Sequence, residues 1–328
     1  MEKKVLVTGA PGWLGTRLVE DLVNKNRKVR CLVIRGIDVS DLTKLKGVEL
    51  FYGDITKPKT LEGITKDIET VFHCIGIIHP KTAKGFFEIN YNGTRNIINQ
   101  CIKNNVKRFI YISSNAAQGF NSSRNKLMDE NGPMKPESNY GLSKYKAERL
   151  IDYFHKSYGL ETVILRPCLF YGIRQPGRFT KFMNMVRSGR PLVFGNGKNL
   201  RSMTHIDNLV QACLLAEKSK KANGKVYWIA DKKPYTTIEI IQTIADEFNV
   251  KLKPIYLPEF LSRICEQIDI FLGNMGFYSL NFHVVGESYR NIGCNIKKAE
   301  EELDYKPKFY LKKGIKEAVD WARENKVL

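Results

Sequence analysis

Short apolar runs alternate with amphipathic stretches over the first half of the chain. Runs of this length, bounded by turn residues, are typical of strands buried in a parallel sheet. The predicted strands cover residues 4–8, 29–34, 48–52, 70–75, 108–112 and 162–166. Predicted helices follow Gly12 and cover residues 85–104 and 140–158. Strands that alternate with helices predict right-handed crossovers and a doubly wound parallel sheet of the α/β class.

The second half of the chain has a less regular pattern. From about residue 170, prolines, glycines and short apolar runs alternate irregularly, and Thr236 or Thr237 caps a predicted helix. A final amphipathic helix is predicted over residues 311–324.

Residues 257–285 form an unusually apolar stretch. Phe260, Ile264, Ile268 and Phe271 recur there at helical spacing. We predict that this stretch packs into the core. The alternatives are a lid over a greasy substrate and a patch that faces a membrane.

Three glycines separate the first predicted strand from the helix that follows it. Gly9 permits the tight turn, Gly12 lets a pyrophosphate approach the helix N-terminus, and Gly15 lets the helix and strand pack closely. In this strand–turn–helix context the spacing indicates a Rossmann-type dinucleotide site. We therefore predict a dinucleotide-binding domain over residues 1–170. Residues 171–328 would form a smaller α/β substrate-binding region, parts of which return to the first domain.

The end of the second predicted strand bears on the choice of dinucleotide. An acidic residue there would bind the ribose 2′-hydroxyl of NAD, whereas an arginine suits the 2′-phosphate of NADP. The chain has Arg35 at this position and no acid before Asp38. The sequence therefore predicts NAD(P) with a lean toward NADP, unless Arg35 is simply an exposed loop residue.

Tyr140 and Lys144 lie one helical turn apart on one face of a predicted helix. A lysine cation beside a phenol favours the phenolate and lowers the pKa of the tyrosine. A tyrosine tuned in this way exchanges a proton with a substrate oxygen near neutral pH. Because many surface helices carry this pair by chance, its meaning depends on the glycine loop.

The 53 lysines and arginines outnumber the 34 acidic residues, which gives a formal net charge of +19. We predict no nucleic-acid partner, because no recognition motif or dense basic stripe with interleaved aromatics occurs. Residues 162–206 contain no acid but eight lysines and arginines. This local field suits a phosphorylated ligand, although an ordinary basic face fits it equally well.

Several expected features follow from the remaining composition. The seven cysteines show no CxxC spacing, so buried thiols in a reducing cytoplasm are predicted, without a metal site. We predict no signal sequence and no stable membrane span, because the apolar runs are too short. The expected location is therefore cytoplasmic.

Together these motifs resemble those of the extended short-chain dehydrogenase/reductases, the NAD-dependent epimerase/dehydratase group. The resemblance covers nearly the whole chain and is strongest over residues 4–213. Its motifs are the glycine loop, Gly53-Asp54-Ile55, His73-Cys74-Ile75-Gly76, Asn90 with Gly93-Thr94, Ser114 before Gly119, Tyr140 with Lys144, Arg166-Pro167 with Tyr171-Gly172, and Gly195-x-Gly197 with Arg201, His205 and Asp207.

The resemblance implies a set of site residues. The implied catalytic residues are Ser114, Tyr140 and Lys144. The implied cofactor-binding residues are Gly9, Gly12, Trp13, Leu14, Gly15, Arg35, Asp54, Ile55, Cys74, Ile75, Gly76, Asn90, Tyr140, Lys144, Pro167 and Leu169. The implied substrate residues are Ser114, Asn115, Arg201 and His205.

The resemblance also implies hydride transfer at a secondary alcohol or ketone carbon. Tyr140 would be the general acid/base, Ser114 would orient the substrate oxygen, and Lys144 would hold the ribose hydroxyls. The expected small-molecule substrate is a nucleotide-activated sugar, with Arg201 at a diphosphate-clamp position. Leu169 departs from the asparagine usual in such members. Dehydration is the least favoured reaction, because Asn115 replaces the acid that dehydratases usually carry.

Two other functions and one assembly state complete the expectations. The alternative enzyme is 3β-hydroxysteroid or sterol dehydrogenase-like and acts on a lipophilic alcohol. The second alternative function is that of a non-catalytic dinucleotide-binding regulator. The presence of Ser114, Tyr140 and Lys144 argues against it. Members of this family commonly pair through the helices near residues 86–104 and 140–158, so a homodimer is expected.

Overall fold

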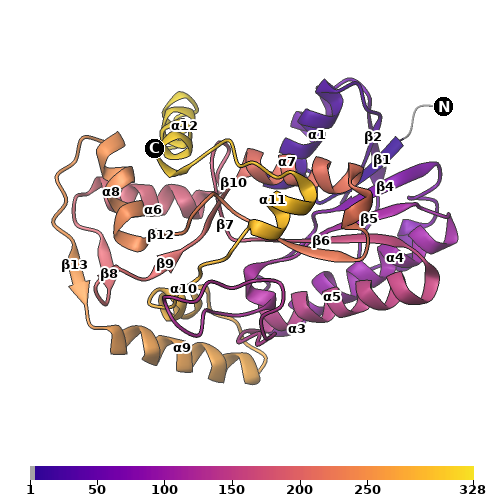
Figure 1. Ribbon diagram of the computed structural model, residues 1–328. Coiled ribbons are helices and arrows are strands. Elements are labelled where there is room, and N and C mark those ends of the chain that lie inside the picture. The colour runs from indigo at the N-terminus through magenta and orange to yellow at the C-terminus, as the bar shows by residue number, and fades with distance from the viewer. Residues whose placement is uncertain (1–3) are drawn as a thin grey trace.

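The computed structural model describes residues 4–328, and within them seven parallel strands form the central sheet (Figure 1). The strands are β1 (Lys4–Thr8), β2 (Val29–Val33), β3 (Val48–Tyr52), β4 (Ile68–His73), β5 (Arg108–Ile112), β6 (Glu161–Pro167) and β11 (Lys225–Ile229). Their order is β11-β6-β5-β4-β1-β2-β3. The predicted Rossmann-type, doubly wound α/β fold is confirmed.

Helices cover both faces of the sheet because successive side chains of a strand point to opposite sides. Val5 and Val7 of β1 belong to one core, and Leu6 between them belongs to the other. The first core includes α1 (Trp13–Asn24) and α7 (Ile206–Lys218), and the second includes α4 (Thr94–Lys103) and α5 (Asn139–Tyr158). The carboxyl ends of the strands lie between these layers and form the edge at which ligands bind in such sheets.

The rest of the chain forms a second region beside this edge (Figure 1). Its short strand pairs are β7 (Leu169–Tyr171) with β10 (Met203–His205), β8 (Leu192–Phe194) with β13 (Ile255–Leu257), and β9 (Leu200–Arg201) with β12 (Tyr235–Thr236). Its helices are α6 (Gly177–Arg187), α8 (Thr237–Glu247), α9 (Glu259–Asn274), α10 (Leu280–Glu287) and α12 (Leu311–Glu324). Thr236 caps α8 as predicted, in a capping box with Glu239.

Short elements complete the described chain. They are α2 (Ser40–Thr43), α3 (Ala83–Phe86), α11 (Lys297–Leu303), the 3-10 turns η1 (Pro58–Leu61), η3 (Asn115–Ala117) and η4 (Lys220–Ala222), and the π-helix η2 (Phe87–Gly93). No helix within residues 4–328 has both the length and the apolarity needed to cross a bilayer.

Several predicted boundaries differ from the structure. The strand predicted over residues 70–75 is Ile68–His73, so Cys74 and Ile75 follow β4. The helix predicted over residues 85–104 is interrupted by η2. Strand β11 was not predicted. It pairs with β6 and returns a late segment of the chain to the central sheet.

The prediction that residues 257–285 pack into the core is wrong for the apolar stripe of α9. Phe260, Ile264 and Phe271 are 58%, 50% and 62% exposed, whereas Ser262 and Glu266 on the opposite side of the helix are buried. Helical spacing identifies an apolar stripe but not the side of the helix that meets the protein. Here the polar stripe faces inward.

Candidate active site

The glycine loop after β1 is packed so closely that Gly9 and Gly15 have no room for a side chain. Gly9 has a φ of +86°, and a Cβ atom on it would lie 2.8 Å from the carbonyl carbon of Cys74. A Cβ atom on Gly15 would lie 2.5 Å from the carbonyl oxygen of Gly9. Gly12 precedes α1 without a side-chain cap, and no acid occupies the first turn. The loop therefore fits the pyrophosphate of a dinucleotide, because helix N-terminal amides bind anions.

Other predicted cofactor residues lie at the carboxyl ends of the neighbouring strands. The Arg35 guanidinium lies 5.0 Å from the centre of the Tyr52 ring at the end of β3. Asp54 accepts hydrogen bonds from the backbone and hydroxyl of Thr56, which shapes the loop after β3. Ile55 is buried against η2. One edge of the sheet therefore gathers the positions expected to bind adenosine.

Not every predicted cofactor residue presents its side chain at this edge. The Trp13 indole donates a hydrogen bond of 2.7 Å to the Ile173 carbonyl and so ties α1 to the second region. Leu14 is buried in the core, which leaves its backbone as the part able to meet a cofactor. Pro167 is buried at the end of β6, and Leu169 is 47% exposed.

Asn90 holds the loop after β4 against α5. Its side-chain oxygen accepts from the Ile77 amide, and its amide nitrogen donates to the Ile77 carbonyl and the Ser143 hydroxyl. Asn90 lies within η2, and π-helical segments often occur at functional sites. The contacts make Asn90 a residue that positions Gly76 and its neighbours.

Ser114, Tyr140 and Lys144 converge where β5 ends and α5 begins. The Lys144 ammonium donates a 2.8 Å hydrogen bond to the Ile112 carbonyl and lies 4.7 Å from the centre of the Tyr111 ring. Burial lowers the pKa of Lys144 to about 8, while the charge of Glu148 opposes the shift. Ser114 interacts with the Tyr140 side chain.

The expected effect of Lys144 on the pKa of Tyr140 is not what the structure shows. Burial raises the pKa of Tyr140 above its ordinary value, and the opposing effects come from Ser114 and Arg178. The Lys144 ammonium is instead directed at a backbone carbonyl at the end of β5. The prediction that Lys144 lowers this pKa is therefore wrong for this structure.

A buried ionic network connects α5 to β6. Arg166 of β6 makes two hydrogen bonds to the Glu148 carboxylate, of 2.9 and 2.6 Å. Ser113 donates to the same carboxylate, and Gln118 accepts from Arg166. Glu148 was missed as a functional residue. The sequence spacing could have identified it, because a residue four positions after Lys144 lies on the same helix face as Lys144.

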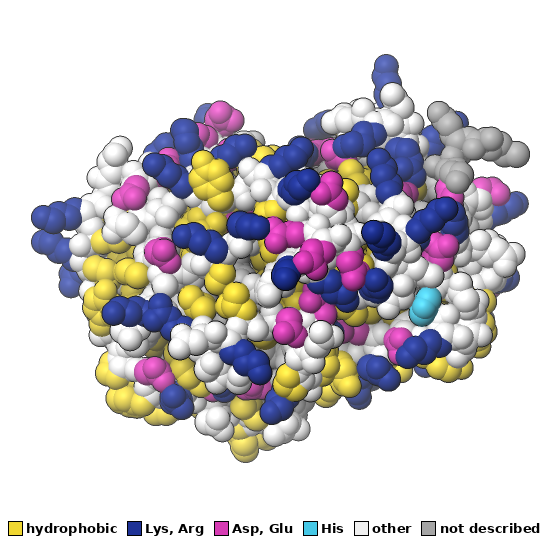
Figure 2. Space-filling model, in the orientation of Figure 1, with side chains coloured by type: hydrophobic (Ala, Val, Ile, Leu, Met, Phe, Trp, Pro, Cys, Tyr) yellow, Lys and Arg dark blue, Asp and Glu magenta, His cyan; other side chains and the backbone are white. Residues whose placement is uncertain are grey.

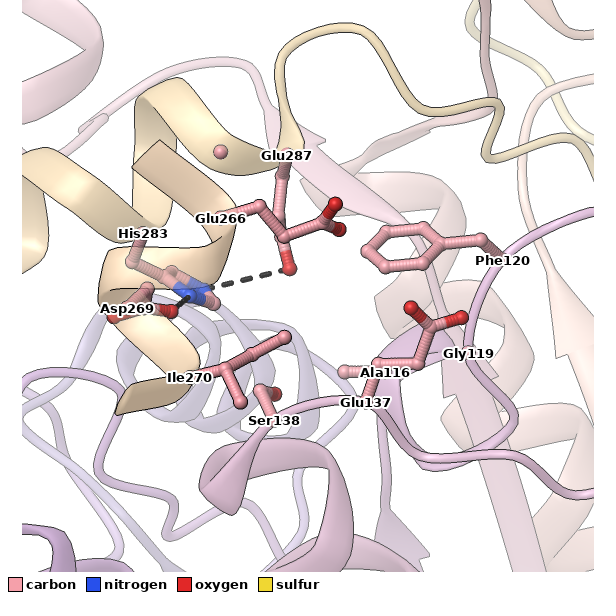
Figure 3. Close-up of a pocket in the computed structure, with 11 residues that line it drawn as sticks. Ala116, Gly119, Phe120, Glu137, Ser138, Glu266, Asp269, Ile270, His283 and Glu287 are labelled. Atoms are coloured by element: carbon pink, nitrogen blue, oxygen red, sulfur yellow. Dashed lines mark hydrogen bonds and ion pairs between the residues drawn. The ribbon is translucent and has the colours of Figure 1, made fainter. Parts of the chain in front are cut away.

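A pocket opens between the loop after β5, the start of α5, and helices α9 and α10 (Figure 3). Its lining includes Ala116, two positions after Ser114, and Ser138, two positions before Tyr140. Its lining carboxylates are Glu137, Glu266, Asp269 and Glu287. His283 lies between two of them, 2.9 Å from Asp269 and 3.5 Å from Glu287. The charge of Glu287 reaches Tyr140. The enclosed volume is about 20 Å³, and every lining carboxylate already has a basic partner. Glu137 and Glu266 pair with Arg290, and Asp269 and Glu287 pair with His283.

Arg178 and two aromatic side chains lie on another side of Tyr140. The Arg178 guanidinium lies 3.1 Å from His79, which lies 2.9 Å from the Tyr278 hydroxyl. No carboxylate within residues 4–328 forms an ion pair with Arg178, and the Arg178 charge acts on Tyr140. Arg178 belongs to the stretch without acids and is a candidate for binding an anionic group.

The predicted substrate residues divide into two groups. Asn115 adjoins Ser114, and Arg201 donates a 2.5 Å hydrogen bond to the Glu287 carbonyl, which places both near the pocket. The assignment of His205 to the substrate is wrong. This side chain is fully buried and stacks on Phe309 with ring centres 4.1 Å apart, so it packs the core beneath α12.

The fold and this arrangement define an enzyme with a dinucleotide-binding Rossmann domain. The model of the NAD dependent epimerase/dehydratase family matches residues 5–230, so the chain belongs to that family. It is 29% identical to the UDP-glucose 4-epimerase of Vibrio cholerae, over 97% of this chain and 94% of the relative. It is 26% identical to a 3beta-hydroxysteroid-dehydrogenase/decarboxylase of Arabidopsis thaliana, over 97% of this chain and 79% of the relative.

Solved structures share the fold. The UDP-glucuronic acid 4-epimerase of Bacillus cereus, solved in complex with NAD, superposes with a TM-score of 0.81 over 98% of this chain and 99% of that chain. The sequence identity of this pair is 22%.

Proposed function

We propose that the protein catalyses hydride transfer at a secondary alcohol or ketone carbon of a nucleotide-activated sugar, as an epimerase or a reductase. The observation that carries this proposal is the convergence of Ser114, Tyr140 and Lys144 at the sheet edge that also carries the glycine loop. Arg178 offers a charge for a phosphate. The relative from Vibrio cholerae, which is named for a nucleotide sugar, supports the same substrate class.

In this mechanism the reacting oxygen lies between the Ser114 and Tyr140 hydroxyls. Ser114 donates a hydrogen bond that orients the oxygen, and Tyr140 gives or takes its proton. A bound nicotinamide supplies or accepts the hydride. Lys144 holds the cofactor ribose, and Asn90 keeps the loop at Gly76 in place beside it.

The direct test is turnover of UDP-glucose by the purified protein with NAD or NADP. We expect UDP-galactose, or a nucleotide-linked keto sugar with reduced cofactor, to be detected by chromatography. The nucleotide-sugar assignment would be refuted if neither product formed from UDP-glucose or from a dTDP-sugar and the protein turned over a sterol.

A second candidate substrate is a lipophilic alcohol. The plant relative named for a 3β-hydroxysteroid favours it. Thermal-shift measurements separate the two, because a ligand stabilises the folded state that binds it. Stabilisation by a sterol but not by UDP-glucose would favour this candidate.

We further propose that NADP is preferred over NAD because of Arg35. Replacing Arg35 with aspartate should weaken NADP binding by roughly 10-fold or more, since a charge-assisted contact is lost and a like charge is placed near the phosphate. NAD affinity should stay the same or rise, because an acid at this position can bind the ribose 2′-hydroxyl. Titration of both cofactors by calorimetry measures the effect, with substitution of the exposed Lys221 by aspartate as a surface control. An unchanged ratio of affinities would contradict the proposal.

A further inference from the structure

Helix α9 has the reverse of the polarity expected for a surface helix. Its exposed side carries Phe260, Leu261, Ile264 and Phe271. Its inward side carries polar groups: Ser262 bonds to Val285 and Ser288, and Glu266 accepts hydrogen bonds from Tyr289 and Arg290. An exposed apolar face of this size normally marks a contact with another molecule.

The apolar face continues beyond both ends of α9. Past its C-terminus, Met275 and Phe277 are each 58% exposed, and Leu280 and Val284 extend the face onto α10. Before its N-terminus, the paired strands β8 and β13 expose Leu192, Ile255 and Tyr256. We call all of these residues together the α9 surface. In Figure 1, α9 lies along the lower edge and β8 and β13 lie at the left side, and Figure 2 shows apolar side chains at both places.

Cationic side chains stand at both ends of the α9 surface. Exposed Lys251 and Lys253 precede β13, and the Lys253 amide bonds to Gly189, which brings exposed Arg190 next to them. At the other end, Thr82 forms a bridge with Phe277, which places exposed Lys81 beside it, together with Lys84, which is paired with Glu88. The exposed Glu259 of α9 is paired with Arg263. The ends of the α9 surface are therefore basic.

We propose that the α9 surface docks on an anionic phospholipid bilayer, with α9 lying in the plane of the interface. Aromatic and aliphatic side chains would enter the boundary between headgroups and acyl chains, and the basic ends would meet the phosphates. A second copy fits less well, because a two-fold contact through this face would bring like charges together on a chain of net charge +19. This docking goes beyond the hydride transfer and does not depend on which alcohol reacts.

Sedimentation with lipid vesicles tests the docking. The full chain should bind vesicles of equimolar phosphatidylcholine and phosphatidylglycerol, and bind phosphatidylcholine vesicles far more weakly. The combined substitutions Phe260→Ser, Ile264→Ser and Phe271→Ser should weaken binding by at least about 10-fold. Replacing Lys251 and Lys253 with glutamine should weaken it by roughly fivefold per charge.

A matched variant controls for the loss of exposed apolar area. Ile37→Ser, Tyr310→Ser and Val327→Ser remove comparably exposed side chains far from α9, and should leave vesicle binding unchanged. Circular dichroism checks that each variant is folded. The proposal is overturned if the wild-type chain ignores the anionic vesicles, or if the α9 variant binds them as well as the wild type. Conversion of a dimer to a monomer by that variant, without wild-type vesicle binding, would assign the surface to a second copy.

Discussion

Replacing Tyr140 with phenylalanine should lower kcat by about 10²–10⁴-fold, the range that a positioned general acid/base contributes. The substitution removes the Tyr140 hydroxyl, which would interact with both Ser114 and the substrate oxygen. It leaves the aromatic ring packed against Phe86. Steady-state kinetics with the substrate identified by the turnover assay gives the measurement. Dinucleotide affinity, measured by calorimetry, should stay within about twofold, because the glycine loop is untouched.

Tyr153→Phe is the matched control for this variant. It removes a phenol from the same helix at a position that is 54% exposed, and should leave kcat unchanged. If Tyr140→Phe retains most of the wild-type kcat, Tyr140 is not the proton donor. His79 and Tyr278, which lie beside it, would then be the groups to examine.

The Glu148→Gln substitution should lower the free energy of unfolding by about 3–5 kcal/mol, the usual cost of removing one partner from a buried ion pair. The Arg166 and Glu148 side chains are 4% and 5% exposed, so the guanidinium would keep its charge without a compensating carboxylate. Urea unfolding measures the loss. Asp152→Asn provides the control on the same helix: the side chains of its ion pair with Lys156 are 28% and 68% exposed, so less than about 1 kcal/mol is expected.

The same variant has a second, functional effect. The Glu148 charge raises the pKa of Lys144 against burial, which lowers it to about 8. Without that charge the pKa falls further, and Lys144 loses its proton at a lower pH. If the cationic form of Lys144 is the active one, the alkaline limb of kcat/KM shifts to lower pH. Loss of stability with an unmoved pH profile would assign Glu148 a structural role alone.

The central fold follows from local patterns that the structure confirms. Short apolar strands, the glycine turn and the alternating helices each specify their own geometry over a few residues, and right-handed crossovers then restrict the topology. Strand β11 was missed because its run, Lys225 to Ile229, joins the sheet from far along the chain. Its pairing with β6 is a long-range contact that no local pattern reports.

The candidate site could be predicted only in part. The glycine spacing predicts a tight turn before a helix, and the Tyr140–Lys144 spacing places two side chains on one helix face. These site residues could therefore be predicted from the sequence. His205 belongs to a motif that predicts a substrate contact, but its side chain packs against Phe309 in the core and cannot contact a substrate. Glu287 and Arg178 reach Tyr140 from separate elements, and their convergence depends on how the second region folds over the sheet edge.

The sequence by itself determined the α/β class, the glycine loop and the Tyr140–Lys144 pair, because each depends on residues close together in the chain. Only the tertiary structure decided the direction of each side chain. Burial raised the pKa of Tyr140, and a backbone carbonyl engaged Lys144. The packing of α9 against the pocket turned its polar side inward and its apolar side outward. Helical periodicity records that two sides differ, and long-range packing determines which of them meets solvent.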